Sequence, residues 1–276
     1  MTNWELYALA GAQKGAEAAK KLDDVIFADA QNHNGIYRGK FLDIDNEELS
    51  RRVQNGFEDL YLGDYITRRI TTTLPDGTVK TENVSLMIAA FNYYYNTGDT
   101  ALTTPHIILI PRNQGFATAA KMNATNTTEG GYLNSYMNQA VLPCYATSLK
   151  TALNNHVLSH RSWLTKSTNT STPSMAGAGL IGAANAAEWA TVDLQLMDEV
   201  QVYGTTVWSS SAYDVGTDNR KLPVFDFITP AQFGRSPFWL RSVVSSTYFA
   251  NCSNLGYATC TGASYASYVR PLIVFG

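Results

Sequence analysis

Charged residues are scarce in this sequence, and neither sign predominates. Charged side chains make up 16% of the 276 residues, and 20 Lys and Arg against 23 Asp and Glu leave a net charge of −3. A nucleic-acid-binding protein neutralises phosphates with a basic surface, which this composition does not provide. Apolar runs such as 86–91 and 106–110 have the length of a strand, whereas a helix needs roughly 20 apolar residues to cross a bilayer. We therefore expect neither nucleic-acid binding nor membrane insertion.

Cysteine is nearly absent as well. Cys144, Cys252 and Cys260 are an odd number of cysteines without a CxxC spacing. The sequence therefore predicts neither a disulfide framework nor a zinc cluster, although the spacing leaves a bridge between Cys252 and Cys260 open. Residues 1–5 contain no basic segment followed by an apolar one, as a secretion signal would. We expect the protein to be made in the cytosol and to stay there until it is released.

Signatures of catalysis are also missing. The sequence contains no GxSxG and no phosphate-binding loop, and residues 177–182 match a dinucleotide motif weakly because no strand precedes them. His156 and His160 have the spacing of two zinc ligands on one helical face, but Val157 replaces the usual glutamate and no third ligand is near. Carboxylates at 43–48 lack the glycine and the distant glutamate of a calcium loop. We expect no catalytic residue, no metal and no cofactor, and we assign both histidines to capping or core hydrogen bonds.

The first segment with a clear pattern is helical. Residues 4–24 are rich in Ala, Glu, Lys and Gln, and small or apolar residues recur at helical spacing. These are Leu6, Leu9, Ala12, Ala16, Ala19 and Leu22. A seam made mostly of alanine buries little area, so we expect this helix to pack on a partner or on sister helices, with a frayed arm as the alternative. Because Asn and Gly follow at 32–35, we assign residues 1–32 to an N-terminal helical arm for attachment or oligomerisation.

The next part of the chain predicts a short helix and then strands. Asp45 followed three residues later by Glu48 is typical of a capped helix, which we expect to run to residue 53. Alternating and β-branched residues predict a long hairpin with strands at 61–74 and 79–95. A buried strand is predicted at 106–110 because its residues form a continuous apolar run.

The second half of the sequence predicts a mixture of helix, loop and strand. Helical spacing between 132 and 156 predicts two helices divided by Pro143. Residues 165–187 are rich in Ser, Thr, Asn, Gly and Ala and predict a long polar loop. A third helix is predicted from the spacing of Val192, Leu196, Met197 and Val200. The chain beyond Gly204 is expected to be rich in strands.

The C-terminal region has the most informative composition. Residues 228–276 contain three arginines and no acidic residue, so no carboxylate in this region can serve acid–base or metal chemistry. Residues 245–268 have no charge, and 14 of these 24 residues are Ser, Thr, Tyr or Asn. Antibody paratopes use the same chemistry, because Tyr offers a large rigid contact area and Ser and Asn offer adaptable hydrogen bonds. A passive β-rich rim explains the composition equally well, since Tyr and Thr favour strands.

Two motifs near the C-terminus indicate a family. The run Phe-Trp-Leu-Arg-Ser at 238–242 is followed by Val-Arg-Pro at 269–271 and by the apolar residues 272–275. With these motifs the chain resembles phage-encoded C-type-lectin-like domain proteins related to formylglycine-generating enzymes. The earlier segments that match are 36–40, 59–65, 122–132, 156–161 and 213–216. The resemblance covers most of the chain and implies an α+β fold, with a C-type-lectin-like domain at 33–276 after the helical arm.

The resemblance also implies a function. Similar phage proteins are non-catalytic parts of the virion that bind a host surface protein or glycan, and some related domains are targets of diversity-generating retroelements. Such diversification leaves Tyr, Ser, Asn, Asp, Gly or Thr at exposed positions. The residues of this kind, which we predict as the ligand-binding set on a surface displayed by 238–271, are Tyr248, Asn251, Ser253, Asn254, Tyr257, Thr259, Tyr265 and Tyr268. The cysteine pair of the oxidases does not map onto this chain, so the resemblance does not carry their activity.

The same interpretation predicts which residues support the displayed surface and which partners the protein has. We expect Arg241 and Arg270 to anchor buried hydrogen bonds beneath the displayed surface. The core strands that hold it are expected to contribute Trp239, Leu240, Val243, Val244, Val269, Leu272, Val274 and Phe275. A shallow polar surface binds weakly on its own, so we expect a homo-oligomer, a trimer, attached to other virion proteins through the N-terminal helix. The alternatives are a structural capsid decoration or head-fibre protein without a receptor role and an enzyme of the formylglycine-generating type.

Overall fold

The fold is built around a five-stranded antiparallel sheet with the strand order β1-β2-β3-β12-β7. The computed structural model describes residues 3–28, 35–113, 115–116, 118–169, 183–209, 220–232 and 235–276. The strands of the sheet are β1 (Tyr65–Thr73), β2 (Val79–Phe91), β3 (Ile107–Pro111), β7 (Leu194–Leu196) and β12 (Pro271–Phe275). Because β12 lies between β3 and β7, the C-terminal strand is an interior strand of the sheet.

Both faces of this sheet are buried. Alternate residues of β3 and β12 enter two different apolar clusters, with Leu109 and Ile273 in one and Ile108 and Val274 in the other. A strand that is covered on both sides must be apolar throughout, which explains the uninterrupted apolar runs of β3 and β12. The helices α3 (Asn46–Gln54) and α4 (Leu142–Ala152) contribute to the first cluster. The predicted hairpin and the predicted buried strand are confirmed.

Smaller sheets flank the central one and carry the C-terminal region. The strands β8 (Phe238–Val243), β9 (Tyr248–Cys252) and β10 (Ala258–Gly262) form a three-stranded sheet in which β9 is the middle strand. The short strands β4 (Ala120–Lys121) and β11 (Ala266–Ser267) pair beside it. The strands β5 (His160–Thr168) and β6 (Ala184–Val192) form a separate hairpin. The mixture of helices and strands makes this an α+β fold, as expected.

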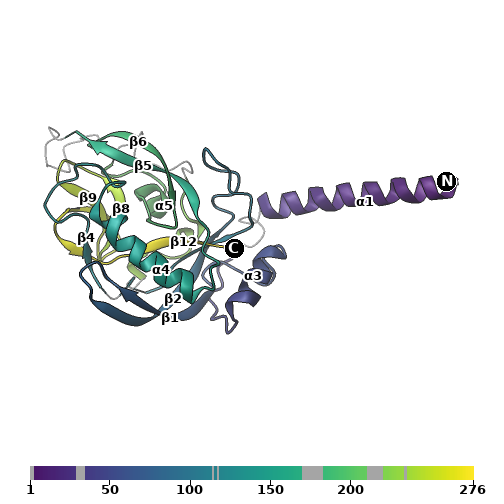
Figure 1. The fold of residues 1–276 in the computed structure, drawn as a ribbon, viewed down its shortest axis with the longest axis horizontal. Coiled ribbons are helices and arrows are strands. Elements are labelled where there is room, and N and C mark those ends of the chain that lie inside the picture. Colours follow the sequence, from purple (N-terminus) through teal and green to yellow (C-terminus); the bar gives the residue numbers. More distant parts are fainter. Residues whose placement is uncertain are drawn as a thin grey trace.

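The N-terminal helix α1 (Asn3–Ala28) extends away from the globular part, and β4, β8 and β9 lie at the opposite end of the molecule (Figure 1). Tyr7 and residues 9–20 are exposed. The predicted helix is therefore confirmed, while the predicted break at 32–35 falls largely outside the described residues. None of the helices in the described part of the chain combines the length and the apolar character needed to span a membrane.

The capped helix α3 begins as predicted. Asp45 is its N-cap, and the carboxylate of Asp45 accepts a hydrogen bond from the Glu48 amide at 2.8 Å. The Glu48 carboxylate forms ion pairs with Arg51 and Arg52. The helix ends at Gln54, one residue beyond the predicted end.

The prediction of two helices divided by Pro143 is wrong. A π-helical turn, η1 (Met137–Val141), runs directly into α4, and Pro143 lies in the first turn of α4. Proline is tolerated in the first turn of an α-helix, and here that turn follows η1 without a break. Residues 132–135 form turns and no helix.

Two further predictions in the second half of the chain are corrected, the first of them at its two ends. The predicted loop 165–187 begins inside β5 and ends inside β6, and its middle part, 170–182, lies outside the described residues. Threonine favours strands as readily as loops, and loop-like composition concealed the hairpin. The predicted third helix is interrupted, because Val192 ends β6, Leu196 ends β7 and the helix α5 (Glu199–Tyr203) begins only after its N-cap Asp198.

Candidate binding surface

The hairpin of β9 and β10 presents a turn at residues 253–257. The Ser253 amide donates to the Tyr257 carbonyl at 3.0 Å, and the Gly256 amide donates to the Ser253 carbonyl at 3.0 Å. Gly256 has a φ of 89°, a conformation that glycine adopts without strain. Asn254, Leu255 and Tyr257 project from this turn, and the side chains of Leu255 and Tyr257 are 63% and 58% exposed.

The eight predicted ligand-binding residues divide into three groups. Asn254, Tyr257 and Tyr265 are exposed, and Tyr265, which follows the other end of β10, is 66% exposed. Tyr248, Thr259 and Tyr268 are half-buried, and both of these tyrosines pack against an apolar cluster. Asn251 and Ser253 are buried.

Asn251 and Ser253 are corrections to the predicted set. Asn251 is 3% exposed, and its side-chain amide donates to the Ser267 hydroxyl at 2.9 Å, which in turn donates to the Pro237 carbonyl. The Ser253 hydroxyl accepts from the Leu255 amide at 3.2 Å inside the turn. Asn251 is covered because β9 is a middle strand, and Ser253 is covered because its hydroxyl closes the turn, whereas the prediction considered residue type without position.

Leu255 was missed by the composition argument. It is an exposed apolar residue between Asn254 and Tyr257, and a search for Tyr, Ser and Asn does not include leucine. The available signal was Gly256, which marks a turn whose neighbouring side chains can project outward. We call Asn254, Leu255, Tyr257 and Tyr265 the exposed C-terminal set.

The scaffold beneath this set is fully buried. All the predicted core residues of the C-terminal strands are buried, and the Trp239 indole N–H donates to the Ala120 carbonyl at 2.7 Å. The guanidinium of Arg241 forms an ion pair with Asp198 at 2.5 Å and donates to the Trp163 carbonyl at 3.3 Å. The predicted buried hydrogen bonds of Arg241 are thus confirmed. Arg270 is fully buried with its guanidinium 4.7 Å from the ring centre of Phe238, and burial lowers the pKa of Arg270 to about 9.

The buried carboxylate of Glu199 holds a segment that contacts the hairpin of β9 and β10. The Glu199 carboxylate accepts hydrogen bonds from the amides of Val207, Trp208 and Ser209 at 3.1 to 3.2 Å and from the Ser209 hydroxyl at 2.6 Å. The Trp208 indole N–H donates to the Ala258 carbonyl of β10 at 3.2 Å. Glu199 therefore holds residues 207–209, and the Trp208 indole ties this segment to the hairpin. The segment 213–216, which contributed to the family resemblance, lies outside the described residues.

His156 and His160 do not share a helical face. His156 follows α4 and its ring Nδ1 lies 3.0 Å from the Gly276 carbonyl, in agreement with a hydrogen-bonding role. His160 begins β5, is buried, and stacks on Tyr94 with ring centres 4.4 Å apart. The ring nitrogens of His160 have no hydrogen bond of good geometry among the described residues, although the Leu158 backbone lies near them, so the predicted core hydrogen bond is not confirmed for this residue. Burial lowers the pKa of His160 to about 3.

The thiols and possible metal ligands show no assembled reactive site. Cys252 and Cys260 are free thiols, and each faces an alanine of the partner strand, Ala258 and Ala250. Burial raises the pKa of Cys252 to about 11, which disfavours the reactive thiolate. Within the described ranges no three His, Cys, Asp or Glu side chains gather as metal ligands.

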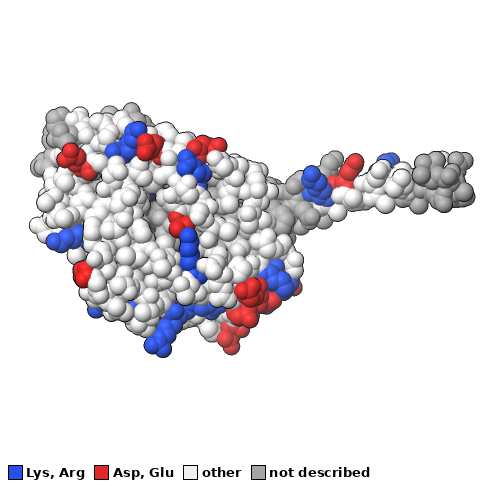
Figure 2. Space-filling view, in the orientation of Figure 1, with Lys and Arg blue, Asp and Glu red and all other residues white. Residues whose placement is uncertain are grey.

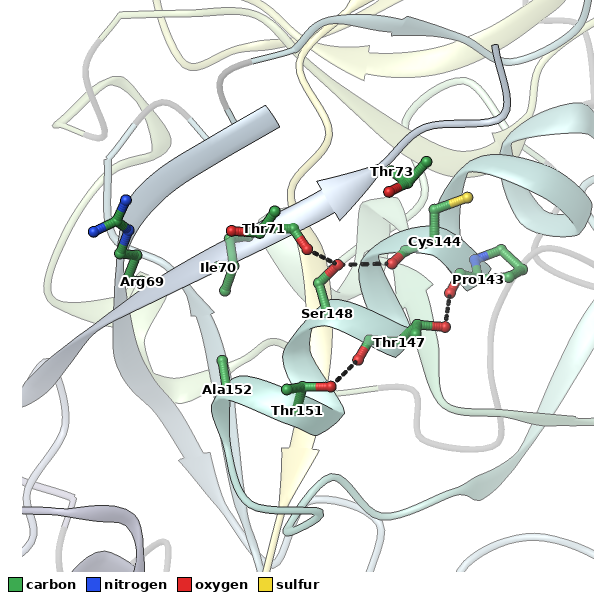
Figure 3. Close-up of a pocket in the computed structure, with 10 residues that line it drawn as sticks. All are labelled: Arg69, Ile70, Thr71, Thr73, Pro143, Cys144, Thr147, Ser148, Thr151 and Ala152. Carbon is green, nitrogen blue, oxygen red and sulfur yellow. Dashed lines mark hydrogen bonds between the residues drawn. The ribbon is translucent and has the colours of Figure 1, made fainter. Parts of the chain in front are cut away.

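A cavity of about 510 Å³ lies between β1 and α4 (Figure 3). Three of its hydroxyl groups already donate to backbone carbonyls: Thr147 to Pro143, Thr151 to Thr147, and Ser148 to Cys144 and Thr71. Burial raises the pKa of the Cys144 thiol. Catalysis by a hydroxyl or thiol requires an adjacent base, and no histidine or carboxylate lines this cavity.

Comparison with known proteins gives no relative: no family model, curated protein or solved structure matches the chain. The C-type-lectin-like resemblance therefore stays a prediction.

Proposed function

We propose that the protein is a non-catalytic receptor-binding component of a phage particle, with a C-type-lectin-like fold. It recognises a host surface protein or glycan through the exposed C-terminal set. The observation that carries this proposal is the exposure of two phenol rings, those of Tyr257 and Tyr265, on a hairpin whose underlying residues are fully buried. Rigid exposed tyrosines provide contact area at a low cost in conformational entropy.

The dimensions and charge of the region support this role. Tyr257 and Tyr265 flank β10, whose five residues separate them by roughly 17 Å, a span that fits within one standard interface. Most of the surface visible in Figure 2 is uncharged, and the densest group of charges lies over α3, away from β9. Interface cores are depleted in charged residues and enriched in tyrosine.

The position of α1 supports attachment at one end and binding at the other. This helix extends from the opposite end of the molecule to β9 (Figure 1). An isolated helix gains little stability in water without tertiary packing. In our proposal three copies associate through α1 and attach to other virion proteins, so that several weak contacts act together.

Adsorption to host cells tests the proposal. The double variant Tyr257→Ala and Tyr265→Ala should lose most of its binding to host cells while its melting temperature stays unchanged, since both side chains are exposed. Val79→Ala is the matched control because Val79 is 60% exposed on β2. Full adsorption by the double variant would remove the receptor role and leave a capsid decoration or head-fibre protein.

Retroelement diversification is a separate part of the proposal and has its own test. The genome beside the gene should contain a reverse transcriptase and a near-repeat of the coding segment for residues 238–271. We expect the repeat to differ at the codons for Asn254, Tyr257 and Tyr265 and to keep the codon for the buried Asn251. Absence of both elements would contradict diversification while leaving receptor binding in place.

A further inference from the structure

A pair of tryptophans lies on the hairpin of β5 and β6, which forms the upper edge of the globular part in Figure 1. Trp163 and Trp189 are direct cross-strand neighbours, and their rings meet edge to face with ring centres 5.4 Å apart. The next residue of β5, Leu164, is fully buried in an apolar cluster. Because successive side chains of a strand point to opposite faces, the two tryptophans lie on the outer face of the hairpin.

These two tryptophans differ from those that support the fold. Both are half-buried, and among the described residues neither joins or packs against an apolar cluster, whereas Trp239 is fully buried in one. The indole N–H groups of Trp208 and Trp239 donate to backbone carbonyls. The indole N–H groups of the pair have no acceptor in the described part of the chain, and they are not among its buried polar atoms without a partner, so both reach water. The pair thus presents apolar rings and two open donors to solvent.

Polar side chains line one side of the pair. Arg161 and Thr191 are the next residues on the same face of the hairpin, about 7 Å along the strands. The Arg161 guanidinium donates to the two carboxylate oxygens of Asp99 at 2.6 and 2.7 Å and to the Thr191 hydroxyl at 3.0 Å. Gly98 lets the loop of Asp99 approach, since a Cβ at Gly98 would lie 3.0 Å from the Cβ of Arg161. Asp99 and Thr191 are exposed, and their oxygens can accept further hydrogen bonds.

The area and charge of this surface limit what it can bind. A stable protein interface buries about 800 Å² on each partner. A tryptophan contributes at most about 250 Å², and both rings of the pair are already half-buried, so the pair fits a small ligand or one unit of a polymer. The charges of Arg161 and Asp99 cancel in their ion pair, and Lys166 and Glu188, toward the other end of the hairpin, are paired as well. The surface therefore favours a neutral ligand.

A neutral hexose ring has the complementary chemistry. One face of such a ring carries only C–H groups, which gain free energy by leaving water for an aromatic surface. Its hydroxyl groups lie around the rim, and each of them both donates and accepts. We propose that the Trp163–Trp189 pair binds a neutral hexose through its C–H face, with the sugar hydroxyls at the indole N–H groups and at Asp99 and Thr191. The inference does not rest on the proposed receptor role, because this site and the exposed C-terminal set share no residue.

Ring sugars and an open-chain analogue test the proposal. The probes are the methyl β-glycosides of glucose, galactose and N-acetylglucosamine, and saturation-transfer NMR measures their binding to the purified full chain. At least one of them should bind with a Kd of about 1–10 mM, with the strongest saturation at its ring C–H protons. Sorbitol carries similar hydroxyl groups without a ring face and should not bind at the same concentration. Tighter binding of a tetrasaccharide of the same sugar indicates a glycan chain as the ligand, and equal binding indicates a single sugar.

Variants at the pair separate sugar binding from hairpin stability. Trp189→Ala removes one of the two rings and should abolish detectable binding. Trp189→Phe keeps a ring against Trp163 and should weaken binding about fivefold, the effect of one hydrogen bond; it carries the test if the alanine variant does not fold. Phe227→Ala is the matched control, since Phe227 is also an exposed aromatic residue but contacts Tyr37.

Three outcomes overturn the proposal. It fails if none of the three glycosides binds at about 10 mM, if sorbitol binds as strongly as they do, or if the variants of Trp189 bind sugar as the native chain does. A native chain that binds no sugar, together with a lower melting temperature of Trp189→Phe, would leave the pair as a cross-strand contact that only stabilises the hairpin. Tyr257→Ala should leave sugar binding unchanged, so a failure here is separate from a failure in cell adsorption.

Discussion

At the residue scale, Trp239 is the side chain whose loss should damage the fold most clearly. Its ring is fully buried, and its indole N–H donates to Ala120 in β4. Trp239→Ala should lower the free energy of unfolding by about 3–5 kcal/mol, because it removes a large core side chain and leaves a cavity. Chemical denaturation measures this change, with Tyr257→Ala as the exposed aromatic control, for which we expect almost none. An equal loss of unfolding free energy in both variants would contradict the assignment of Trp239 to the scaffold and of Tyr257 to the exposed C-terminal set.

Residue type in the C-terminal region predicted exposure for some residues and failed for others. Tyr257 and Asn251 both belong to the Tyr, Ser and Asn composition, yet Tyr257 lies at a turn and Asn251 faces Ser267. Composition carries no information about which face of a strand is covered, because that depends on a segment far along the chain. The cavity between β1 and α4 could not be predicted either, since its walls come from two segments far apart in the sequence.

At the scale of elements, the backbone amides of residues 207–209 all donate to one carboxylate, that of Glu199. Glu199→Gln keeps one acceptor oxygen but loses the charge, and hydrogen bonds to charged groups contribute about 1.5–3 kcal/mol. We expect amide hydrogen exchange at Val207, Trp208 and Ser209 to accelerate at least tenfold, because these amides donate to Glu199. The amides of β12 serve as the internal reference, since that strand is buried throughout. Unchanged exchange at 207–209 would show that other contacts hold the segment.

Elements with a strong local signal were predictable, and elements defined by distant pairing were not. The β1–β2 hairpin, β3 and α3 were found from alternation, an apolar run and an N-cap. The ends of β5 and β6, residues 165–168 and 184–187, were assigned to a loop because they are made of Thr, Ser, Lys, Ala and Asn. At α5 the missed signal was the capping box of Asp198 and Gln201, which marks the first residue of the helix. The spacing of apolar residues from Val192 onward had suggested an earlier start.

At the scale of the whole molecule, α1 should determine assembly without contributing to the globular fold. Removal of residues 1–32 should convert the proposed trimer to a monomer and leave the main melting transition unchanged, because the described side chains of α1 are exposed. Light scattering coupled to size exclusion measures the assembly, and calorimetry measures the melting transition. A truncated chain that remains trimeric would place the interface on the globular part.

The stability of the whole molecule should fall in mild acid because of two buried histidines. Burial lowers the pKa of His106 to about 4 and that of His160 to about 3, whereas an unfolded histidine titrates near pH 6.5. Between pH 4 and pH 6.5 the unfolded chain therefore binds more protons than the folded chain. The free energy of unfolding is highest above pH 6.5 and decreases as the pH falls through this range. From pH 6.5 to 4.5 each histidine should remove about 2–3 kcal/mol.

Denaturation at a series of pH values measures this loss, and one variant separates the histidines from the carboxylates. The shifted aspartates, such as Asp59 and Asp193, have pKa values below 3.8, so they contribute below this range of pH. His160→Phe keeps an aromatic ring against Tyr94 and removes the group that titrates. It should therefore reduce the loss between pH 6.5 and 4.5 by about half. The same pH dependence in the variant and the native chain would show that His160 is charged in the fold or that other groups dominate.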